Sequence, residues 1–272
     1  MKYLIFDFET VPDPEHNWKP PEDQPNKFPP IPVHKIVSIG GMLLSVNELG
    51  TDSKNKVLWF GNFGFPNDEL SMILGFLKMC EHENPELVSY NGRGFDLCVL
   101  EHRCMRWGVS APHIFEWNFR NRYKEQGHMD LQDLLTNFGA SSRSKLADIC
   151  VLLGMPGKMD VDGSKVSEMI AAGKQQEVDS YCLCDVVETA WLLVRFLHLR
   201  GDISTTTNYN VVHAIRTACI AKDDNMLNKL LELTNIDRLS LEDQKDVLEQ
   251  AIRRSLADLP KEDNDYDPDL PF

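Results

Sequence analysis

The first ten residues read Met1-Lys-Tyr-Leu-Ile-Phe-Asp-Phe-Glu-Thr10. The apolar run 3–6 predicts a short strand that leads directly into two acids, Asp7 and Glu9. Because residues two apart on a strand point to the same face, the two carboxylates are expected to project together. Hard divalent cations take oxygen ligands, so this stretch predicts one part of a carboxylate cage.

Two further acids stand in short motifs far along the chain. Asp96 closes Tyr-Asn-Gly-Arg-Gly-Phe-Asp, after a predicted strand at 87–90 and at the start of an apolar helical run. Asp185 closes Tyr-Cys-Leu-Cys-Asp on a predicted helix, 181–200, where Tyr181 and Asp185 share one face because they are four residues apart. Phosphodiester cleavage by two cations about 4 Å apart needs such a set of carboxylates.

The order, residue types and spacing of these motifs resemble those of the DEDD 3′→5′ exonucleases of the RNase H-like superfamily. The tyrosine four residues before the last acid is similar to the tyrosine branch of that family. The pattern looks most like stand-alone proteins similar to the proofreading exonuclease domain of family B DNA polymerases. The resemblance extends to the segments 128–135 and 155–166 and covers roughly residues 1–200.

The resemblance implies a 3′→5′ exonuclease that uses two Mg²⁺ or Mn²⁺ and releases nucleoside 5′-monophosphates from single-stranded 3′ ends. It implies that Asp7, Glu9 and Asp185 hold the first cation. Asp7 would bridge to the second, and Asp96 would hold the waters of that cation. Tyr181 would orient the attacking water together with Glu9. Because a free tyrosine titrates near pH 10, orientation is a better expectation than full general-base action.

A substrate-binding set follows from the same resemblance. Its members are Thr10, Val11, Asn91, Phe95 and Lys158. Separately, the segment 117–124 interleaves aromatic and cationic residues, a pattern that suits a groove for single-stranded nucleic acid. The alternative for that segment is a surface loop whose aromatic side chains lie in the core.

Several alternatives stay open from the residues alone. Asp96 could be only the N-cap of its helix, and Tyr181 an ordinary residue of an amphipathic helix. The motifs do not report the 2′-hydroxyl, so an RNA-trimming exoribonuclease is the alternative within the same chemistry. A non-catalytic module that binds 3′ ends or recruits replication proteins is the alternative in a different class.

Length and composition limit the number of domains, the mode of nucleic-acid binding and the location. The 272 residues suit one domain with a helical part appended, or two small domains, and leave no room for a polymerase beside the exonuclease. The formal net charge of −14 argues against a protein that coats nucleic acid through a basic surface. Seven cysteines without a Cys-x-x-Cys pair indicate reduced thiols, and no signal peptide or membrane span is visible, so a cytoplasmic location is expected.

The predicted elements alternate in the manner of an α/β fold. Strands are expected at 35–46 and 56–60 and a helix at 68–79, which predicts a mixed sheet flanked by helices; the resemblance makes it the five-stranded RNase H-like sheet. Residues 11–34 hold eight prolines, so we expect no regular structure there, and a lid beside the acids is possible for so long a loop. The expected organisation is an exonuclease domain over 1–200, a helical C-terminal extension over 201–256, with helices at 209–222, 226–233 and 241–256, and a disordered acidic tail over 257–272.

The tail ends in an apolar tip that comes directly after acids. This ending is similar to the C-terminal tip of bacterial single-stranded-DNA-binding proteins, and it predicts docking onto proteins that recognise such a tip. Docking would link the enzyme to DNA replication or repair and favour DNA as substrate; the alternative is a solvated appendage. The residues expected to bind such a partner are Asp267, Asp269, Leu270, Pro271 and Phe272.

Overall fold

A computed structural model describes residues 1–25, 27–47, 55–115, 120–124, 126–157, 163–242 and 245–257. Within these residues five strands form one sheet in the order β3-β2-β1-β4-β5. β1 pairs antiparallel with β2 and parallel with β4, so the predicted mixed five-stranded sheet is confirmed. The strands are β1 (Lys2–Pro12), β2 (His34–Ser45), β3 (Lys56–Asn62), β4 (Glu86–Ser89) and β5 (His128–Asp130).

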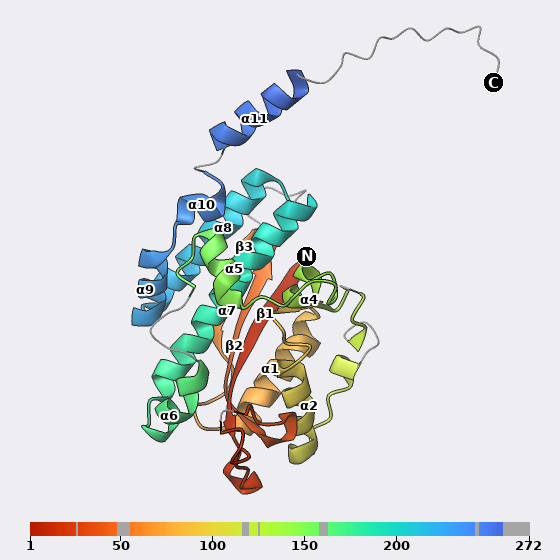
Figure 1. The fold of residues 1–272 in the computed structure, drawn as a ribbon, viewed down its shortest axis with the longest axis vertical. Helices are drawn as coiled ribbons and strands as arrows, with labels where there is room; N and C mark the ends of the chain where they lie inside the picture. The colour runs from red at the N-terminus through yellow and green to blue at the C-terminus, as the bar shows by residue number, and fades with distance from the viewer. Residues whose placement is uncertain are drawn as a thin grey trace, which may run out of the picture.

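Helices cover both faces of this sheet. Figure 1 shows α1 and α2 along one face and α7, with α8 and α5, along the other. The helices are α1 (Glu69–Glu83), α2 (Asp96–Trp107), α4 (Leu131–Leu135), α5 (Leu146–Leu153), α6 (Val166–Ala171), α7 (Gln175–Arg200), α8 (Thr205–Lys222), α9 (Asn225–Leu233), α10 (Ile236–Ser240) and α11 (Lys245–Ala257).

The alternation of side chains along β1 divides the core in two. Leu4, Phe6 and Phe8 are buried among residues of α1 and α2. Tyr3 and Ile5 are buried on the opposite face, in the cluster that contains α7. Asp7 and Glu9 continue the second set, so the pleat of the strand directs both acids toward α7.

α7 is longer than the sequence predicts. It begins at Gln175 and not at residue 181, because Val178 packs with Val37, Val166 and Met169 in a small cluster of its own. The helix ends where Gly201 takes a left-handed conformation with φ 80°, a common helix terminator.

The proline-rich segment is more regular than expected. β1 runs on to Pro12, which pairs with His34, and two short 3₁₀ helices cover Pro14–His16 and Ile31–Val33. The amide of Asp13 donates to the carbonyl of Val33 at 2.7 Å, which closes the segment at its base. The expectation of no regular structure over 11–34 is therefore wrong, since strand pairing at both ends fixes the segment.

The helices after residue 200 pack against α7. Side chains of α8, α9 and α10 belong to the same hydrophobic cluster as the α7 face of the sheet. α11 projects beyond α10 (Figure 1). None of the described helices has the length and apolar character needed to cross a bilayer. Residues 258–272 lie outside the described part of the chain, so the partner-binding tip stays a prediction.

Candidate active site

Asp7 and Glu9 lie on the central strand, beside its antiparallel neighbour. Asp7 pairs with Gly40 and Glu9 with Ser38 on β2. The register shifts directly after Glu9, where β2 carries one extra residue, Val37. Such a bulge increases the local twist and redirects side chains, and bulges recur beside active sites.

Asp96 is turned toward β1 from the first turn of α2. Its Oδ1 accepts a hydrogen bond of 3.0 Å from the backbone amide of Phe8, between the two acids of the strand. The helix is capped at Phe95, without a side-chain hydrogen bond. The alternative that Asp96 serves only as an N-cap is therefore wrong.

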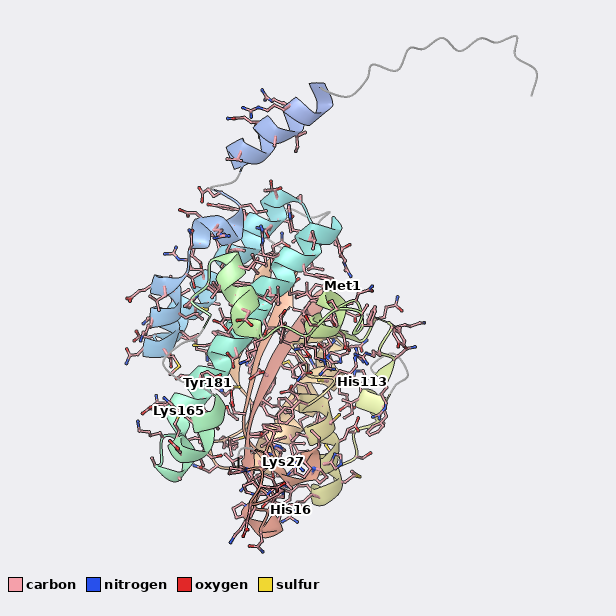
Figure 2. The ribbon with its side chains drawn as sticks, in the orientation of Figure 1. Met1, His16, Lys27, His113, Lys165 and Tyr181 are labelled. Carbon is pink, nitrogen blue, oxygen red and sulfur yellow. The ribbon has the colours of Figure 1, made fainter. Side chains whose placement is uncertain are left out.

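Tyr181 lies where α7 passes over β1 (Figure 2), and Asp185 follows about one turn later on the same helix. The ring of Tyr181 packs against the cluster that contains Val37 and Val166, and its hydroxyl and the carboxylate of Asp185 lie close enough to shift each other's pKa. The i, i+4 spacing places the two side chains on one face of α7. Tyr181 therefore combines an ordinary packing role with a polar one.

The pKa values of the four acids are linked, as those of groups in one site are. Burial raises the pKa of Asp7, and the charges of Asp96, Asp185 and Glu9 raise it further. Burial, followed by the charges of Asp185 and Asp96, likewise raises the pKa of Glu9. Burial raises the pKa of Asp96 and of Asp185 to about 7, the latter against the lowering effect of the Tyr181 hydroxyl. Carboxyls that repel one another in a buried site are stabilised as anions by a cation among them.

Cys182 lies within this cluster as well. Its Sγ accepts from the amide of Gly40 at 3.1 Å and donates to the carbonyl of Asp7 at 3.3 Å. Oxygen atoms of Asp7 and Glu9 and this sulfur lie within 4.8 Å of one another. Burial, with the charge of Asp7 next, raises the pKa of Cys182 well above its usual value, so beside these charged acids the group is a thiol, which donates to the carbonyl of Asp7.

Gly40 is a residue of the site that sequence reasoning missed. A Cβ at that position would lie 2.9 Å from the sulfur of Cys182, so the absence of a side chain lets α7 approach β2 opposite Asp7. The only signal in the sequence is a glycine pair inside a strand pattern, which often marks a close approach of another backbone.

The predicted substrate residues do not all lie at one place in the structure. Thr10 and Phe95 border a cavity of about 400 Å³ beside Glu9, which the proline-rich segment also lines. Val11 instead packs with the cluster beneath Tyr181. Asn91 lies in the loop before α2 with a left-handed φ of 67°. Lys158 lies outside the described residues.

Asp130, at the end of β5, is a second residue that sequence reasoning missed. Its two carboxylate oxygens accept from the amides of Asn91 and Arg93, each at 2.9 Å. It also accepts from the amide of Gln132 and so begins α4. One buried carboxylate thus holds the loop that delivers Asp96. The signal was present, because Asp130 falls in the segment 128–135 that carries the family resemblance.

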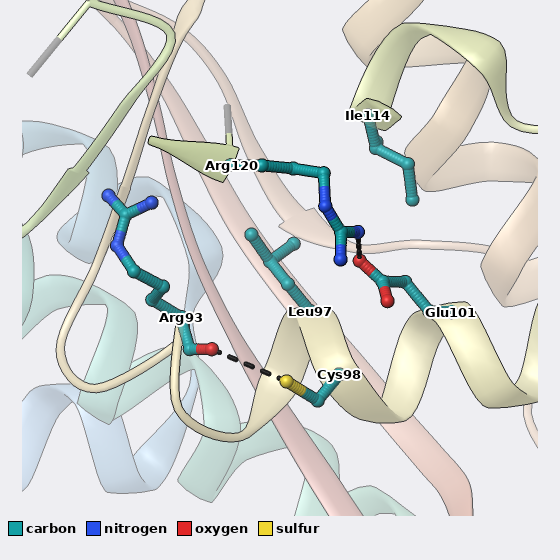
Figure 3. Close-up of a pocket in the computed structure, with 6 residues that line it drawn as sticks. All are labelled: Arg93, Leu97, Cys98, Glu101, Ile114 and Arg120. Carbon is teal, nitrogen blue, oxygen red and sulfur yellow. Dashed lines mark hydrogen bonds and ion pairs between the residues drawn. The ribbon is translucent and has the colours of Figure 1, made fainter. Parts of the chain in front are cut away.

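The segment 117–124 is only partly described. Arg120 forms an ion pair with Glu101 of α2, beside a small cavity of about 90 Å³ that Arg93 also lines (Figure 3). Arg122 pairs with Asp133 at 2.6 Å. Tyr123 is 72% exposed, so the alternative that the aromatic residues lie in the core is wrong for this one. Residues 117–119 are outside the described part.

Comparison with known proteins bears on this site. Residues 26–233 match the family described as "Predicted 3'-5' exonuclease related to the exonuclease domain of PolB". The matched range includes Asp96, Tyr181 and Asp185 and begins after Asp7 and Glu9. No curated protein matches the chain.

The fold is similar to that of a solved family B DNA polymerase from the hyperthermophilic archaeon Pyrobaculum calidifontis. The TM-score is 0.52 at 18% sequence identity, over 82% of this chain and 29% of the polymerase chain. The likeness concerns the fold alone and less than a third of the polymerase, and it confirms the predicted RNase H-like class. By the family match, this chain belongs to the predicted 3′–5′ exonucleases related to the exonuclease domain of family B DNA polymerases.

Proposed function

We propose that the protein is a divalent-metal-dependent 3′→5′ exonuclease that releases nucleoside 5′-monophosphates from single-stranded DNA ends. One observation carries the proposal: Asp7, Glu9, Asp96 and Asp185 come from three separate elements to one buried site, where Asp96 accepts from the amide of Phe8 between the two strand acids. Acids that served only to keep the protein soluble would lie apart on its surface. Four carboxyls in one buried site fit the oxygen ligand set of Mg²⁺ or Mn²⁺.

The residues divide between two cations. Asp7, Glu9 and Asp185 would hold one, and Asp7 with Asp96 would hold the other. When bound, such a pair supplies the positive charge that stabilises the attacking and leaving oxygens of phosphodiester hydrolysis. In that reaction water adds to the last phosphorus, and the 3′ oxygen of the penultimate nucleotide leaves with a proton.

Tyr181 holds a proton and orients the water. Burial, followed by the charges of Asp185, Glu9 and Asp7, raises the pKa of its hydroxyl. A phenol that keeps its proton at neutral pH cannot be the base. The hydroxyl lies close enough to Asp185 to lower the pKa of that carboxyl, and its oxygen can accept a hydrogen bond from the attacking water.

The cavity beside Glu9 supports a single-stranded substrate. Its volume of about 400 Å³ is in the range of small-ligand pockets, and Phe28 and Phe95 offer aromatic surface to an unpaired base. A duplex end would have to open before its last nucleotide entered. DNA is proposed because the structural relative is a DNA polymerase, which also favours a role in replication or repair.

The test is digestion of end-labelled single-stranded DNA, with RNA of the same sequence in parallel, in the presence of Mn²⁺ and with EDTA as control. Wild type should release mononucleotides from DNA only with the cation. Asp7→Ala and Asp185→Asn should lose at least about a hundredfold in rate, since each removes a ligand. Glu81→Ala, at an exposed acid of α1, is the matched control and should cleave normally. Wild-type rates in Asp7→Ala would refute the proposal.

A further inference from the structure

His34 connects the proline-rich segment to the strand that carries the acids. Its Nδ1 lies 2.9 Å from the hydroxyl oxygen of Thr10, and its Nε2 lies 3.0 Å from the carbonyl oxygen of Pro29. A carbonyl can only accept, so Nε2 carries the hydrogen. Burial lowers the pKa of the ring, which is therefore neutral, and Nδ1 is left as an acceptor. The hydroxyl of Thr10 must then donate to Nδ1.

Aromatic packing fixes the same ring independently of its hydrogen bonds. The centroid of Phe28 lies 4.9 Å from that of His34, and the centroid of Phe95 lies 5.0 Å away in an edge-on arrangement. Only 3% of His34 is exposed. The imidazole therefore has one orientation, set by a residue of the proline-rich segment and by the residue before Asp96.

Thr10 lines the cavity beside Glu9, together with His34 and Phe95. The register of β1 against β2 shifts between Glu9 and Thr10, where β2 has the extra residue Val37. With its hydrogen committed to His34, the Thr10 oxygen offers only lone pairs to a ligand.

We propose that His34 is a positioning residue that turns Thr10 into a hydrogen-bond acceptor for the free 3′-hydroxyl of the last nucleotide. This rests on the proposed function. A 3′-hydroxyl can donate to the Thr10 oxygen, whereas an end that lacks the hydroxyl cannot. The enzyme should therefore prefer hydroxyl-terminated strands, and the preference should depend on His34 although His34 does not touch the hydroxyl.

The test compares two single-stranded DNA oligonucleotides that differ only at the last nucleotide, one with a 3′-hydroxyl and one 2′,3′-dideoxy. The rate of removal of that nucleotide gives kcat/KM for each end. Wild type should favour the hydroxyl end about tenfold, the size expected for one hydrogen bond in a confined site. A residue that only supported the fold would slow both ends alike and leave their ratio unchanged.

Four variants test the link from His34 through Thr10 to the 3′-hydroxyl. Thr10→Val keeps the shape and removes the hydroxyl, and His34→Phe keeps a ring and removes the acceptor; each should bring the ratio of the two ends close to one. The variant that carries both substitutions should show no further loss of the preference for the hydroxyl end. His34→Asn, whose carboxamide oxygen can take the place of Nδ1, should retain most of the preference. Thermal melting of each variant reports folding.

The outcomes separate this inference from the proposed function. If wild type cleaves neither end, the proposed function fails. If it cleaves both ends equally, or if Thr10→Val changes the ratio while a folded His34→Phe does not, the role of His34 is overturned. Should His34→Phe not fold, a preference retained by Thr10→Val, or lost in a folded His34→Asn, overturns it instead.

Discussion

At the scale of single residues, the hydroxyl of Tyr181 offers a sharp test of the chemistry. Tyr181→Phe keeps the ring that packs near Val37 and Val166 and removes only the hydroxyl beside Asp185. We expect kcat to fall about a hundredfold or more, the usual size of such a contribution, while the concentration of Mn²⁺ needed for half-maximal rate changes little. Tyr209→Phe, on α8, is the matched control. A kcat equal to that of wild type would remove Tyr181 from the mechanism.

The raised carboxyl pKa values make a second prediction, on stability. An unfolded aspartate titrates near pH 4, whereas burial raises the pKa of Asp96 and Asp185 to about 7 in the folded chain. Between those values the folded state binds more protons than the unfolded state, so stability falls as pH rises. Without divalent cations, the melting temperature should fall from pH 5 to pH 8, and Mg²⁺ or Mn²⁺ should restore it at pH 8.

A matched pair of variants separates this local effect from general charge repulsion in a chain of net charge −14. Asp185→Asn removes a buried charge, so it should raise the melting temperature at pH 8 without metal and weaken the response to Mn²⁺. Glu81→Gln removes an exposed charge and should do neither. A melting temperature that rises between pH 5 and pH 8 in EDTA would contradict the assignment.

Motif spacing predicted that the acids and Tyr181 lie together because each is held by its own element. The contacts of Gly40 and His34 join different elements and could not be read from the sequence, whereas Asp130 falls in a segment that the family resemblance already covered. Gly40 pairs with Asp7 and faces Cys182, and His34 pairs with Pro12 and lies against Thr10. Strand register of this kind is a property of the folded sheet.

At the scale of elements, a buried ion network joins α1, α2 and the proline-rich segment. Arg103 of α2 donates to both carboxylate oxygens of Glu69 at 2.7 and 2.6 Å, and to Asp13 at 2.8 Å. Glu69 also accepts from the amide of Ile36 and from the indole of Trp107. The network fixes Asp13 near the start of the proline-rich segment, directly after Pro12, which lines the cavity beside Glu9.

Removing the cation of this network should be costly. Arg103→Leu leaves Glu69 and Asp13 buried without their partner, and we expect a loss of about 3–5 kcal/mol in the free energy of unfolding. Arg106→Leu, on the same helix, breaks an exposed pair with Glu15 and a long contact of 3.9 Å with the buried Asp13, and should cost less than about 1 kcal/mol. Denaturant titration measures both, and equal effects would show that the buried network is not what anchors the segment.

Local patterns predicted the type of these elements better than their ends. The apolar stripe predicted a helix after residue 181, but α7 gains its first turns from contacts with β2 and α6. Proline content predicted an irregular segment, but Asp13 and Val33 join its ends by a hydrogen bond that periodicity cannot show.

At the scale of the whole molecule, the helices after residue 200 are continuous with the core of the sheet. Val212 of α8 and Leu230 of α9 are fully buried in the same cluster as Ile5 of β1. The indole of Trp191 in α7 donates to the carbonyl of Val212 at 3.4 Å. The family match likewise runs through α9 to residue 233. These contacts indicate that the sheet and α8–α10 fold together.

Two truncations test that continuity. Ending the chain at residue 200 exposes the α7 face that carries Trp191, and each buried aliphatic side chain lost from α8–α10 removes about 1.5–3 kcal/mol. Several such losses exceed the net stability of about 5–15 kcal/mol that a domain has, so 1–200 should not unfold cooperatively. Ending it at residue 242 removes the tail and α11, none of whose described side chains belongs to that cluster, and should leave the midpoint of urea unfolding within error of the full chain. A cooperative transition for 1–200 at the same midpoint would show that the exonuclease core stands alone and that α8–α10 are an appendage.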